Sequence, residues 1–401
     1  MFNSLKFKVI LFGFIFTFFS SFGQSYFLGL FNSSIRDALS ITHGQFGSIY
    51  ASATLCSSLL LIWVGKKIDD VNIFKFAFFV TILLSFACFF FSRVTSVFLL
   101  FIAIFLMRFS GQGMMSHTAS TTISRYFTKT RGRALSISWF GLSSAEFIMP
   151  VLMVYLLTFI GWQNLWLIFS ITVLIILPIA SFLLIKNLNL DSREDSNKDI
   201  KEVEIKQWKR AEVIKDYRFY IISSNMLAMP WIFTGFAVFQ SFIQTSKGWG
   251  PYVIAQSFMS YSIFSVLTLF LSGFLIDKFT SRKLLIYMNI PLLLSVIVLF
   301  FFDTPVTAFI FLGLVGISNG FANILGSSTW AELYGVKYLG SIKALTTALM
   351  VFATAFGTAL FGYLIDIGFS VGDIAVVSGS YIFISLILLF LVRKKLNPVI
   401  I

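Results

Sequence analysis

The chain has 401 residues, of which 58% are hydrophobic and 12% are charged, and its formal net charge is +13. Soluble domains carry about 25% charged and about 45–50% apolar residues, so this composition excludes a water-soluble protein and makes lipid the main solvent. The two cysteines, Cys56 and Cys88, lie inside apolar runs, which excludes a disulfide framework and a cysteine metal site.

Twelve apolar runs follow one another along the chain, and each is close to the roughly 20 residues that a helix needs to cross a bilayer. The first six lie near 9–31, 45–64, 72–92, 97–121, 134–158 and 164–185, and the last six near 219–242, 251–275, 284–302, 305–330, 343–365 and 374–392. The first run follows Lys6 and Lys8 as in a signal peptide. It has no small-residue cleavage site, so we predict an uncleaved span.

A polar interval separates the two sets of runs. Residues 186–218 carry eight acidic and nine basic side chains, and we interpret them as a solvated linker that ends in a short interfacial helix. We therefore predict an all-α polytopic membrane protein. It has a six-helix bundle at 1–185, a cytoplasmic linker at 186–218 and a second six-helix bundle at 219–401.

The basic residues predict the orientation of the chain. If the N-terminus is cytoplasmic, all of the 30 Lys and Arg residues except Arg36, Arg93, Arg108 and Lys247 belong to cytoplasmic segments. Short cytoplasmic loops of membrane proteins carry such an excess of Lys and Arg. We therefore predict a multi-pass protein of the cell's inner membrane with both termini in the cytoplasm.

An internal repeat relates the two halves. Gly65 and Asp69 of the stretch GKKIDD recur 208 positions later as Gly273 and Asp277 of GFLIDKFTSRK. The same offset aligns two further glycine-containing stretches, namely Gly132 with Gly340 and RFSGQGMM with GISNGFAN. One offset for all of these matches indicates two parallel six-helix repeats.

Parallel repeats related by an axis along the membrane normal are the plan of the major facilitator superfamily, and the chain resembles this superfamily over essentially its whole length. GFLIDKFTSRK is similar to the signature loop of the superfamily, whereas GKKIDDVNIFK lacks the following basic pair. RFSGQGMM and RYFTKTRGRALSISWFG resemble its fourth and fifth helices and point to the branch of oxalate/formate and monocarboxylate porters. Members of that branch typically carry basic residues in the later cavity helices, and spans eight to ten have none in their apolar cores.

The resemblance implies that the Gly–Asp loops act as gates. A carboxylate at a cytoplasmic helix end would face the N-terminus of a helix in the other half, where the helix dipole favours it. Such contacts would hold the outward-facing state closed on the inside. The candidate gating residues are Gly65, Asp69, Gly273, Asp277, Arg131, Arg133 and Glu332. Ordinary positive-inside charge explains the two arginines equally well.

Arg108 and Glu146 are ionisable residues deep inside predicted spans, where a charge is costly and is a functional hypothesis by default. The helical rise places both about 20–25 Å from the cytoplasmic surface on adjacent spans, so they can form an ion pair. The pair then either only locks spans four and five together, or Arg108 binds a substrate anion in a forked grip that Lys cannot reproduce. In a third interpretation, compatible with the second, Glu146 is the proton-coupling site, because burial favours its neutral form and Arg108 its charged form.

Neutral polar residues are the candidates in the second half. Asn319, Asn323 and Ser327 recur every four residues on one stripe of span ten. Asn is costly in lipid unless it is paired, so the stripe either lines a cavity or forms helix–helix hydrogen bonds. In the resembled fold, spans one, four, seven and ten line the central path. The candidate substrate-binding residues are Arg108, Asn319, Asn323, Gln24, Trp231 and Gln240.

These residues predict transport rather than catalysis. The only histidines, His43 and His117, form no Ser/His/Asp or zinc-binding pattern, so we expect no enzyme, no cofactor and no metal. We predict a monomeric secondary active transporter of a small organic anion or zwitterion, such as a carboxylate, that works by alternating access. Protons are the favoured coupling ion, and uniport and exchange stay open. The partners of the transporter are the solute and the lipid bilayer, not nucleic acid.

Two other functions stay open. The Phe-rich interior suggests efflux of drugs or amphipathic compounds as an alternative. A membrane enzyme would need clustered His, Asp or Glu at a membrane face, and a non-transporting sensor would need an appended signalling domain. The longest soluble stretch is the 186–218 linker, so the sequence favours neither of them.

Overall fold

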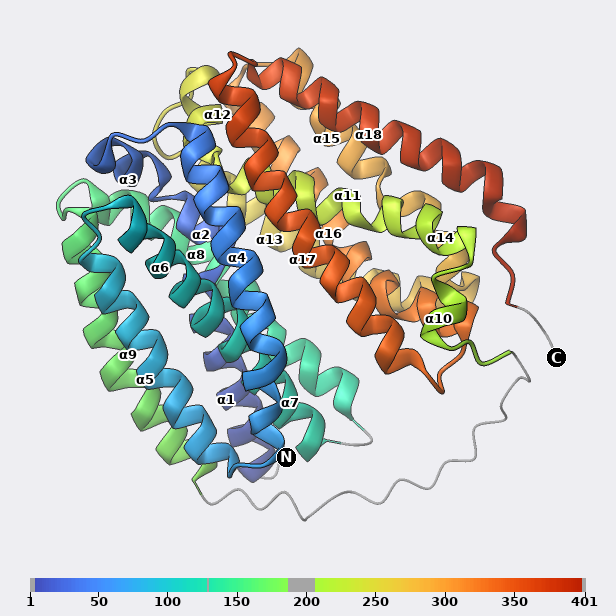
Figure 1. Cartoon of the computed structure of the whole chain (residues 1–401), viewed down its shortest axis with the longest axis horizontal. Helices are drawn as coiled ribbons and strands as arrows, with labels where there is room; N and C mark the ends of the chain where they lie inside the picture. The colour runs from blue at the N-terminus through green and yellow to red at the C-terminus, as the bar shows by residue number, and fades with distance from the viewer. Residues whose placement is uncertain (1–3, 128–129, 187–205, 399–401) are drawn as a thin grey trace. The chain divides into compact units, whose positions relative to one another are not determined.

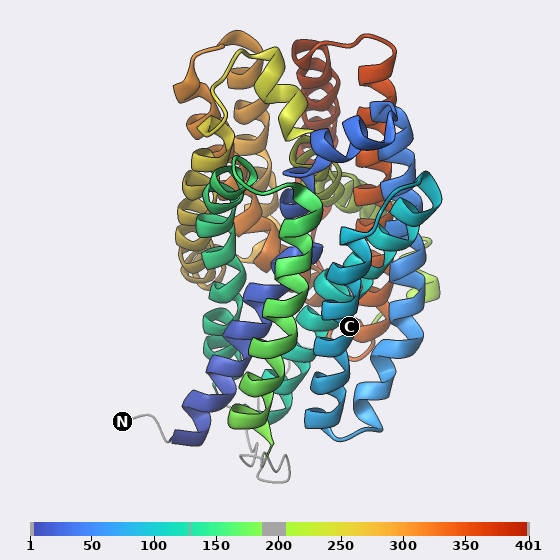
Figure 2. The same ribbon diagram turned by 90° about the vertical axis from the view of Figure 1, so that its left-hand side faces the viewer.

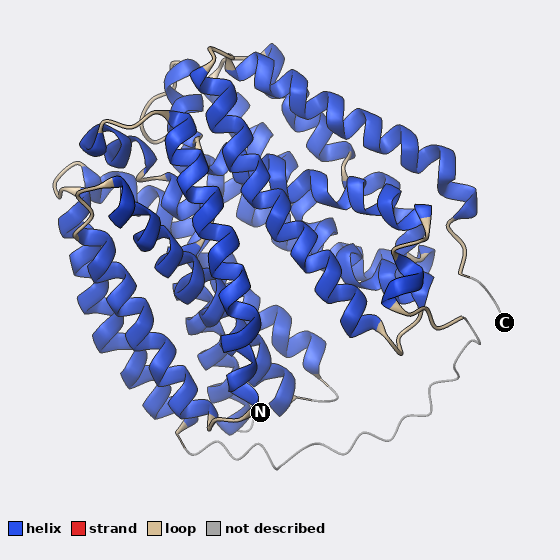
Figure 3. Cartoon of the chain, viewed as in Figure 1, coloured by secondary structure: helices blue, strands red, loops and turns tan. Residues whose placement is uncertain are grey.

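The computed structural model describes residues 4–127, 130–186 and 206–398, which form helices joined by loops and contain no strand (Figures 1 and 3). Twelve helical spans in this part of the chain are long and apolar enough to cross a membrane. The prediction of an all-α protein with twelve spans is therefore confirmed. The chain divides into two compact units, Met1–Asp199 and Ile200–Ile401, and residues 187–205 of the predicted linker lie outside the described residues.

The described part of the first unit contains six spans, two of which are interrupted. Its elements are α1 (Ser4–Ser20), η1 (Ser21–Gly23), α2 (Ser25–Gly29), α3 (Asn32–Leu39), α4 (His43–Val64), η2 (Gly65–Asp69), α5 (Ile73–Ser92), α6 (Val97–Met107), η3 (Arg108–Met115), α7 (Ser116–Tyr126), α8 (Arg131–Leu157) and α9 (Trp162–Ile185). Helix α1 packs against α8, α5 against α9, and α4 against α6. Figure 2 shows this unit from the side on which α5 and α9 lie.

The second unit is built from α10 (Arg210–Val213), α11 (Tyr217–Val238), α12 (Gln240–Ser246), α13 (Val253–Phe279), α14 (Ser281–Met288), α15 (Ile290–Phe301), α16 (Pro305–Tyr334), α17 (Leu339–Asp366), α18 (Val371–Val392) and η4 (Arg393–Lys395). Helix α13 packs along α16, and α11 lies against α17 and α18. Helix α15 packs against both α16 and α18.

Polar residues fix where several spans begin. The Thr42 hydroxyl accepts a hydrogen bond from the backbone N–H of Gln45, whose side chain accepts the Thr42 N–H at 2.9 Å, so α4 starts with a capping box. Ser370 and Asp373 form the same arrangement at α18. Asn72 caps α5 through the N–H of Phe74 at 2.9 Å. These side chains satisfy the first N–H groups of helices that otherwise lie in apolar surroundings.

Small residues set the closest helix contacts in both units. A Cβ added to Gly141 of α8 would collide with the Phe14 carbonyl oxygen of α1, and one added to Gly316 of α16 would collide with the Tyr261 carbonyl oxygen of α13. A Cβ on Gly320, one turn further along α16, would lie 2.6 Å from the Ser265 carbonyl oxygen. Residues spaced by four thus let two backbones approach.

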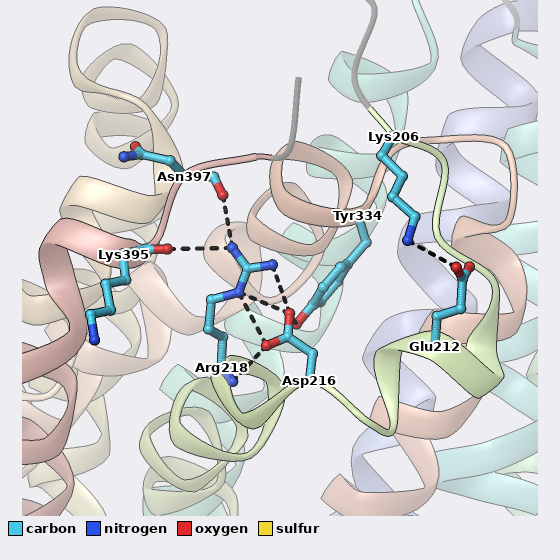
Figure 4. A network of polar contacts seen from close by, with 7 residues as sticks. All are labelled: Lys206, Glu212, Asp216, Arg218, Tyr334, Lys395 and Asn397. Atoms are coloured by element: carbon cyan, nitrogen blue, oxygen red, sulfur yellow. Dashed lines mark hydrogen bonds and ion pairs between the residues drawn. The ribbon is translucent and has the colours of Figure 1, made fainter. Parts of the chain in front are cut away.

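The described end of the linker is fastened to the second unit by a buried charge network (Figure 4). Asp216 receives hydrogen bonds from the Arg218 guanidinium at 2.8 Å and from the Tyr334 hydroxyl at 3.1 Å. Arg218 also donates to the backbone oxygens of Lys395 at 3.3 Å and Asn397 at 2.8 Å. The network therefore ties the start of α11 to the end of α16 and to the segment that follows α18.

Candidate functional site

The two interruptions of the first unit meet at a pair of glycines. Span one breaks after η1, where Gln24 has an extended backbone (ψ 151°), and span four contains the π-helix η3. A Cβ on Gly111 of η3 would lie 2.7 Å from the backbone nitrogen of Gly23, and one on Gly23 would collide with the backbone of Met107 and Gln112. Only glycine allows this approach. Broken helices and π-bulges frequently occur at functional sites, because they leave backbone groups available.

Arg108 begins the π-helix and lies in this junction. Its side chain is buried, and Nη1 donates to the Gly23 carbonyl oxygen at 3.1 Å and to the Ser25 hydroxyl at 3.2 Å. The guanidinium carbon lies 5.4 Å from the centroid of the Tyr50 ring, and the Tyr50 hydroxyl donates to Ser25 at 3.0 Å. Every one of these partners is neutral.

Glu146 lies on α8 and is only 8% exposed. Within the part of the chain that the structure describes, it forms no hydrogen bond and no ion pair, and its electrostatic neighbour is the phenol of Tyr26 on α2. Among these residues Arg108 and Glu146 therefore do not form the ion pair that their similar depth suggested. The break in span one is the reason, because it brings the Gly23 carbonyl and Ser25 within reach of the guanidinium.

Gln24 lies at the break itself. Its backbone oxygen accepts the N–H groups of Phe27 at 3.2 Å and Leu28 at 3.1 Å, so the residue starts α2, and its side chain is half-buried. His117 hydrogen-bonds through Nε2 to the Gly65 carbonyl oxygen at 3.0 Å. It thereby links α7 to the loop after α4.

The second unit contains a cavity of about 130 Å³, which we call the Asn319 cavity. Asn319 and Asn323 of α16 line it, together with residues of α11, α14 and α17, among them Met226, Met229, Met288 and Met350. The Asn319 side chain also donates to the Ser265 hydroxyl of α13 at 2.9 Å. Both interpretations of the asparagine stripe therefore apply to Asn319, which lines a cavity and joins two helices. The Ser327 side chain lies outside the described residues.

Two predicted residues of span seven lie elsewhere in the second unit. The Trp231 ring packs against Tyr381 of α18 at 5.2 Å and against Phe356 of α17 at 6.0 Å, and it does not line the Asn319 cavity. Gln240 is buried, donates to the Ala237 carbonyl oxygen at 2.9 Å and lines a separate space of about 20 Å³. The structure thus does not bring these residues together with Asn319 and Asn323.

Sequence reasoning missed a buried asparagine pair in the second unit. Asn225 of α11 and Asn289, between α14 and α15, are both fully buried, and the Asn289 amide donates to the Asn225 carbonyl oxygen at 2.6 Å. The Asn225 amide lies 3.5 Å from the Ser385 hydroxyl. The sequence contains a feature that indicates these residues, because each asparagine interrupts an apolar run. Ser25 and Tyr50, the other missed residues, carry no charge that would single them out.

The predicted gating residues of the first unit make their side-chain contacts with other described residues of that unit, not with one another. Asp69 forms an ion pair with Arg125 of α7, whose Nη1 also donates to the Ile68 carbonyl oxygen at 3.0 Å. Arg131 donates to the Phe127 carbonyl oxygen at 3.3 Å, and Arg133 is exposed. Arg125 is thus the partner that the sequence did not assign to Asp69.

Among the predicted gating residues of the second unit, Glu332 places its carboxylate at the N-terminus of α14. It accepts the backbone N–H of Ser281 at 2.8 Å and that of Arg282 at 3.4 Å, which are the first residues of α14. A Cβ on Gly273 would meet no atom within 4 Å. The Asp277 side chain lies outside the described residues, so its gating role stays a prediction, as do those of the other six residues.

Comparison with known proteins agrees with this architecture. The family model described as Major Facilitator Superfamily matches residues 13–256. A search of curated proteins finds no match. Among solved structures, a bacterial homolog to the human lysosomal transporter Spinster, in an inward-facing and occupied conformation, superposes with a TM-score of 0.74 at 14% identity, covering 98% of this chain and 97% of that chain. The nucleoside transporter NupG gives a TM-score of 0.68 at 16% identity, covering 98% and 99%.

Identities this low establish a shared fold and leave the solute open. The porter branch also stays a prediction, because the matching model describes the superfamily as a whole. The match spans more than half of the chain, and the twelve spans and the two units agree with it. The chain therefore belongs to the Major Facilitator Superfamily.

Proposed function

We propose that this chain is a secondary active transporter that moves a small organic anion or zwitterion by alternating access, and that Arg108 binds the negatively charged group of the solute. The observation that carries the proposal is a buried guanidinium whose partners are all neutral. A buried charge is costly unless an opposite charge or a full set of hydrogen bonds compensates for it. No carboxylate supplies that charge to Arg108 among the described residues, so we infer that the solute does.

Arg108 keeps donors for such a group. Nη1 donates hydrogen bonds to Gly23 and Ser25, whereas Nε is buried without a hydrogen-bond partner in the described structure. A carboxylate can accept two parallel N–H bonds from one guanidinium, which gives both affinity and orientation. The Ser25 hydroxyl accepts hydrogen bonds from the guanidinium and from the Tyr50 hydroxyl, so its own proton adds a neutral donor to this candidate site.

Glu146 is the candidate for proton coupling. Its carboxyl group is buried and has no cationic partner among the described residues. A carboxyl group in such surroundings is accommodated more easily as the neutral acid than as the anion. We therefore infer that Glu146 takes up a proton in one state of the transport cycle and releases it in another, where water or a cation reaches it.

The test is solute uptake into proteoliposomes under an imposed proton gradient, with monocarboxylates, dicarboxylates, amino acids and a cationic dye. We expect an anion to accumulate in wild type and Arg108→Lys to raise its KM about 10-fold or more, because one lysine cannot replace a forked charge-assisted pair. Glu146→Gln should keep exchange of solute for solute but lose accumulation. Arg93→Lys, at an exposed loop residue, is the matched control. If Arg108→Lys and Glu146→Gln both transport as wild type does, the proposal is wrong.

Efflux of amphipathic compounds is the second candidate function. The Asn319 cavity supports it, because four of its lining residues are methionines, and the flexible thioether side chain adapts to ligands of different shape. In that case the cationic dye should be the transported solute, and Arg108→Lys should leave its rate unchanged. Met229→Ala and Met350→Ala should then lower the rate.

We also propose that both termini lie in the cytoplasm and that the protein is an inner-membrane monomer. The distribution of Lys and Arg supports this orientation. A cysteine introduced at Lys8 or Lys395 should be labelled by a membrane-impermeant maleimide only after the membrane is permeabilised. Labelling in intact cells would reverse the assignment.

A further inference from the structure

A basic groove lies at one end of the second unit. Residues of α13, α14 and the segment that follows α18 line a space of about 680 Å³, which we call the Arg282 groove. Its basic residues are Arg282, Lys283, Arg393 and Lys394, and its aromatic wall includes Phe279 and Tyr287. None of the transport residues discussed above belongs to it.

The charge of this groove is not neutralised locally. Within the described part of the chain, none of the four basic side chains forms an ion pair. Arg282 is instead oriented by neutral oxygens, donating to the Leu396 carbonyl at 3.2 Å and to the Asn397 side chain at 2.8 Å. Glu332 lies close by, but its carboxylate accepts the backbone N–H groups of Ser281 and Arg282. Four cationic groups around one open space form a site for an anion.

The walls show that this anion has an apolar part. Phe279 is 42% and Tyr287 58% exposed, although both are large and largely apolar. The two flanking helices also carry exposed apolar side chains, with Phe274 of α13 75% exposed and Leu391 of α18 70% exposed. In a membrane protein such a surface faces acyl chains. The groove therefore joins a basic end to a lipid-facing wall, which a small soluble anion would not use.

We propose that the Arg282 groove binds an anionic phospholipid. The headgroup phosphate lies among Arg282, Lys283, Arg393 and Lys394, and an acyl chain follows Phe279 and Tyr287 toward the bilayer. Basic pockets between membrane helices on the cytoplasmic side hold anionic headgroups, and the predicted orientation puts the groove on that side. This inference is independent of the solute and of the proton site.

The repeat provides a matched control for the test. At the offset of 208, Lys283 and Lys394 correspond to Lys75 and Lys186 of the first unit, whereas Arg282 corresponds to Phe74 and Arg393 to Ile185. All four lysines are exposed. The variants Lys283→Gln/Lys394→Gln and Lys75→Gln/Lys186→Gln thus remove equal charge from equivalent positions at little risk to folding.

The experiment is native mass spectrometry of the delipidated full-length protein titrated with phosphatidylglycerol or phosphatidylcholine. We expect wild type to bind phosphatidylglycerol preferentially. The Lys283→Gln/Lys394→Gln variant should bind it about 25-fold more weakly, at roughly fivefold per lysine, and the control variant should bind as wild type does. Equal binding of the two lipids, or an equal loss in both variants, would overturn the proposal. Displacement of the bound phosphatidylglycerol by millimolar glycerol phosphate would also overturn the proposal, because it would show that the groove binds soluble phosphates.

Discussion

Gly23 and Gly111 touch backbone to backbone although 87 residues separate them in the chain. The contact joins the 3-10 turn in span one to the π-helix in span four. It also brings the Gly23 carbonyl oxygen to Arg108, which donates to it at 3.1 Å. The position of the only deeply buried guanidinium of the described first unit therefore depends on the absence of a side chain at two glycines.

A methyl group at Gly111 should disrupt this junction. In Gly111→Ala the new Cβ would lie 2.7 Å from the Gly23 nitrogen and 2.9 Å from its Cα, and neither backbone atom can rotate away. Overpacking of this kind costs about 1–3 kcal/mol. We expect a lower melting temperature in detergent and a loss of solute uptake. Gly340→Ala is the control, since a Cβ there meets no atom within 4 Å, and unchanged melting of Gly111→Ala would contradict the contact.

The Tyr50 hydroxyl and the Tyr50 ring should contribute separately to the Arg108 site. Tyr50→Phe keeps the ring 5.4 Å from the guanidinium and removes only the hydroxyl that donates to Ser25. The loss of one hydrogen bond of about 1 kcal/mol should raise the KM for the anion about fivefold. Tyr50→Leu removes the ring as well and should raise it further. Tyr155→Phe, at an exposed tyrosine, should match wild type, and equal KM values for Tyr50→Phe and Tyr50→Leu would exclude a role for the ring.

The sequence predicts the spans and the repeat but not the interruptions. Apolar runs reveal helices because their length and hydropathy are local properties. Sequence spacing cannot show that Gly23 and Gly111 meet, since that contact arises only when spans one and four pack together. Arg108 stood out as a buried charge, yet its main partner is a backbone oxygen, which no residue type indicates.

The rotation of a helix about its axis is equally hard to predict. The sequence indicates Trp231 and Gln240 only through their place on span seven. The packing of α11 against α17 and α18 turns Trp231 toward Phe356 and Tyr381. Polar residues, which are costly in lipid, recur on one face of span ten, and this recurrence indicates that the Asn319 side chain faces a cavity or another helix. Periodicity within a helix therefore indicates which way the Asn319 side chain points. Membership of a path-lining span alone does not indicate which way Trp231 points.

Glu332 should stabilise the start of α14 through charge as well as hydrogen bonding. Glu332→Gln keeps an oxygen for the Ser281 N–H but removes the negative charge from the helix N-terminus. We expect it to cost about 0.3–1 kcal/mol, and Glu332→Ala to cost more because it also leaves the N–H without its acceptor. Thermal melting of the two variants at low and high salt separates the contribution of the charge from that of the hydrogen bond. If Glu332→Gln and Glu332→Ala melt alike, the carboxylate acts through its charge alone.

Asp216 makes the stability of the second unit depend on pH. Burial alone would raise the pKa of Asp216, but the hydrogen bonds and the charge of Arg218 outweigh it and hold the pKa below its ordinary value. An acid whose pKa is lower in the folded protein stabilises the fold fully above its unfolded pKa of about 3.9. This contribution is lost as the pH falls through the lower folded pKa, when protonation weakens the bonds to Arg218.

Thermal melting of wild type and Asp216→Asn between pH 7 and pH 2.5 tests the direction of this pH dependence. At neutral pH Asp216→Asn should melt at a lower temperature, because Arg218 keeps its charge and loses the carboxylate that lies 2.7 Å from its Nη2. The difference between the two proteins should stay constant down to about pH 4 and shrink below it. Asp70→Asn, at an exposed carboxylate, should follow wild type at every pH. A gap that instead widened in acid would mean that folding raises the pKa of Asp216, so that the neutral acid stabilises the network more than the carboxylate does.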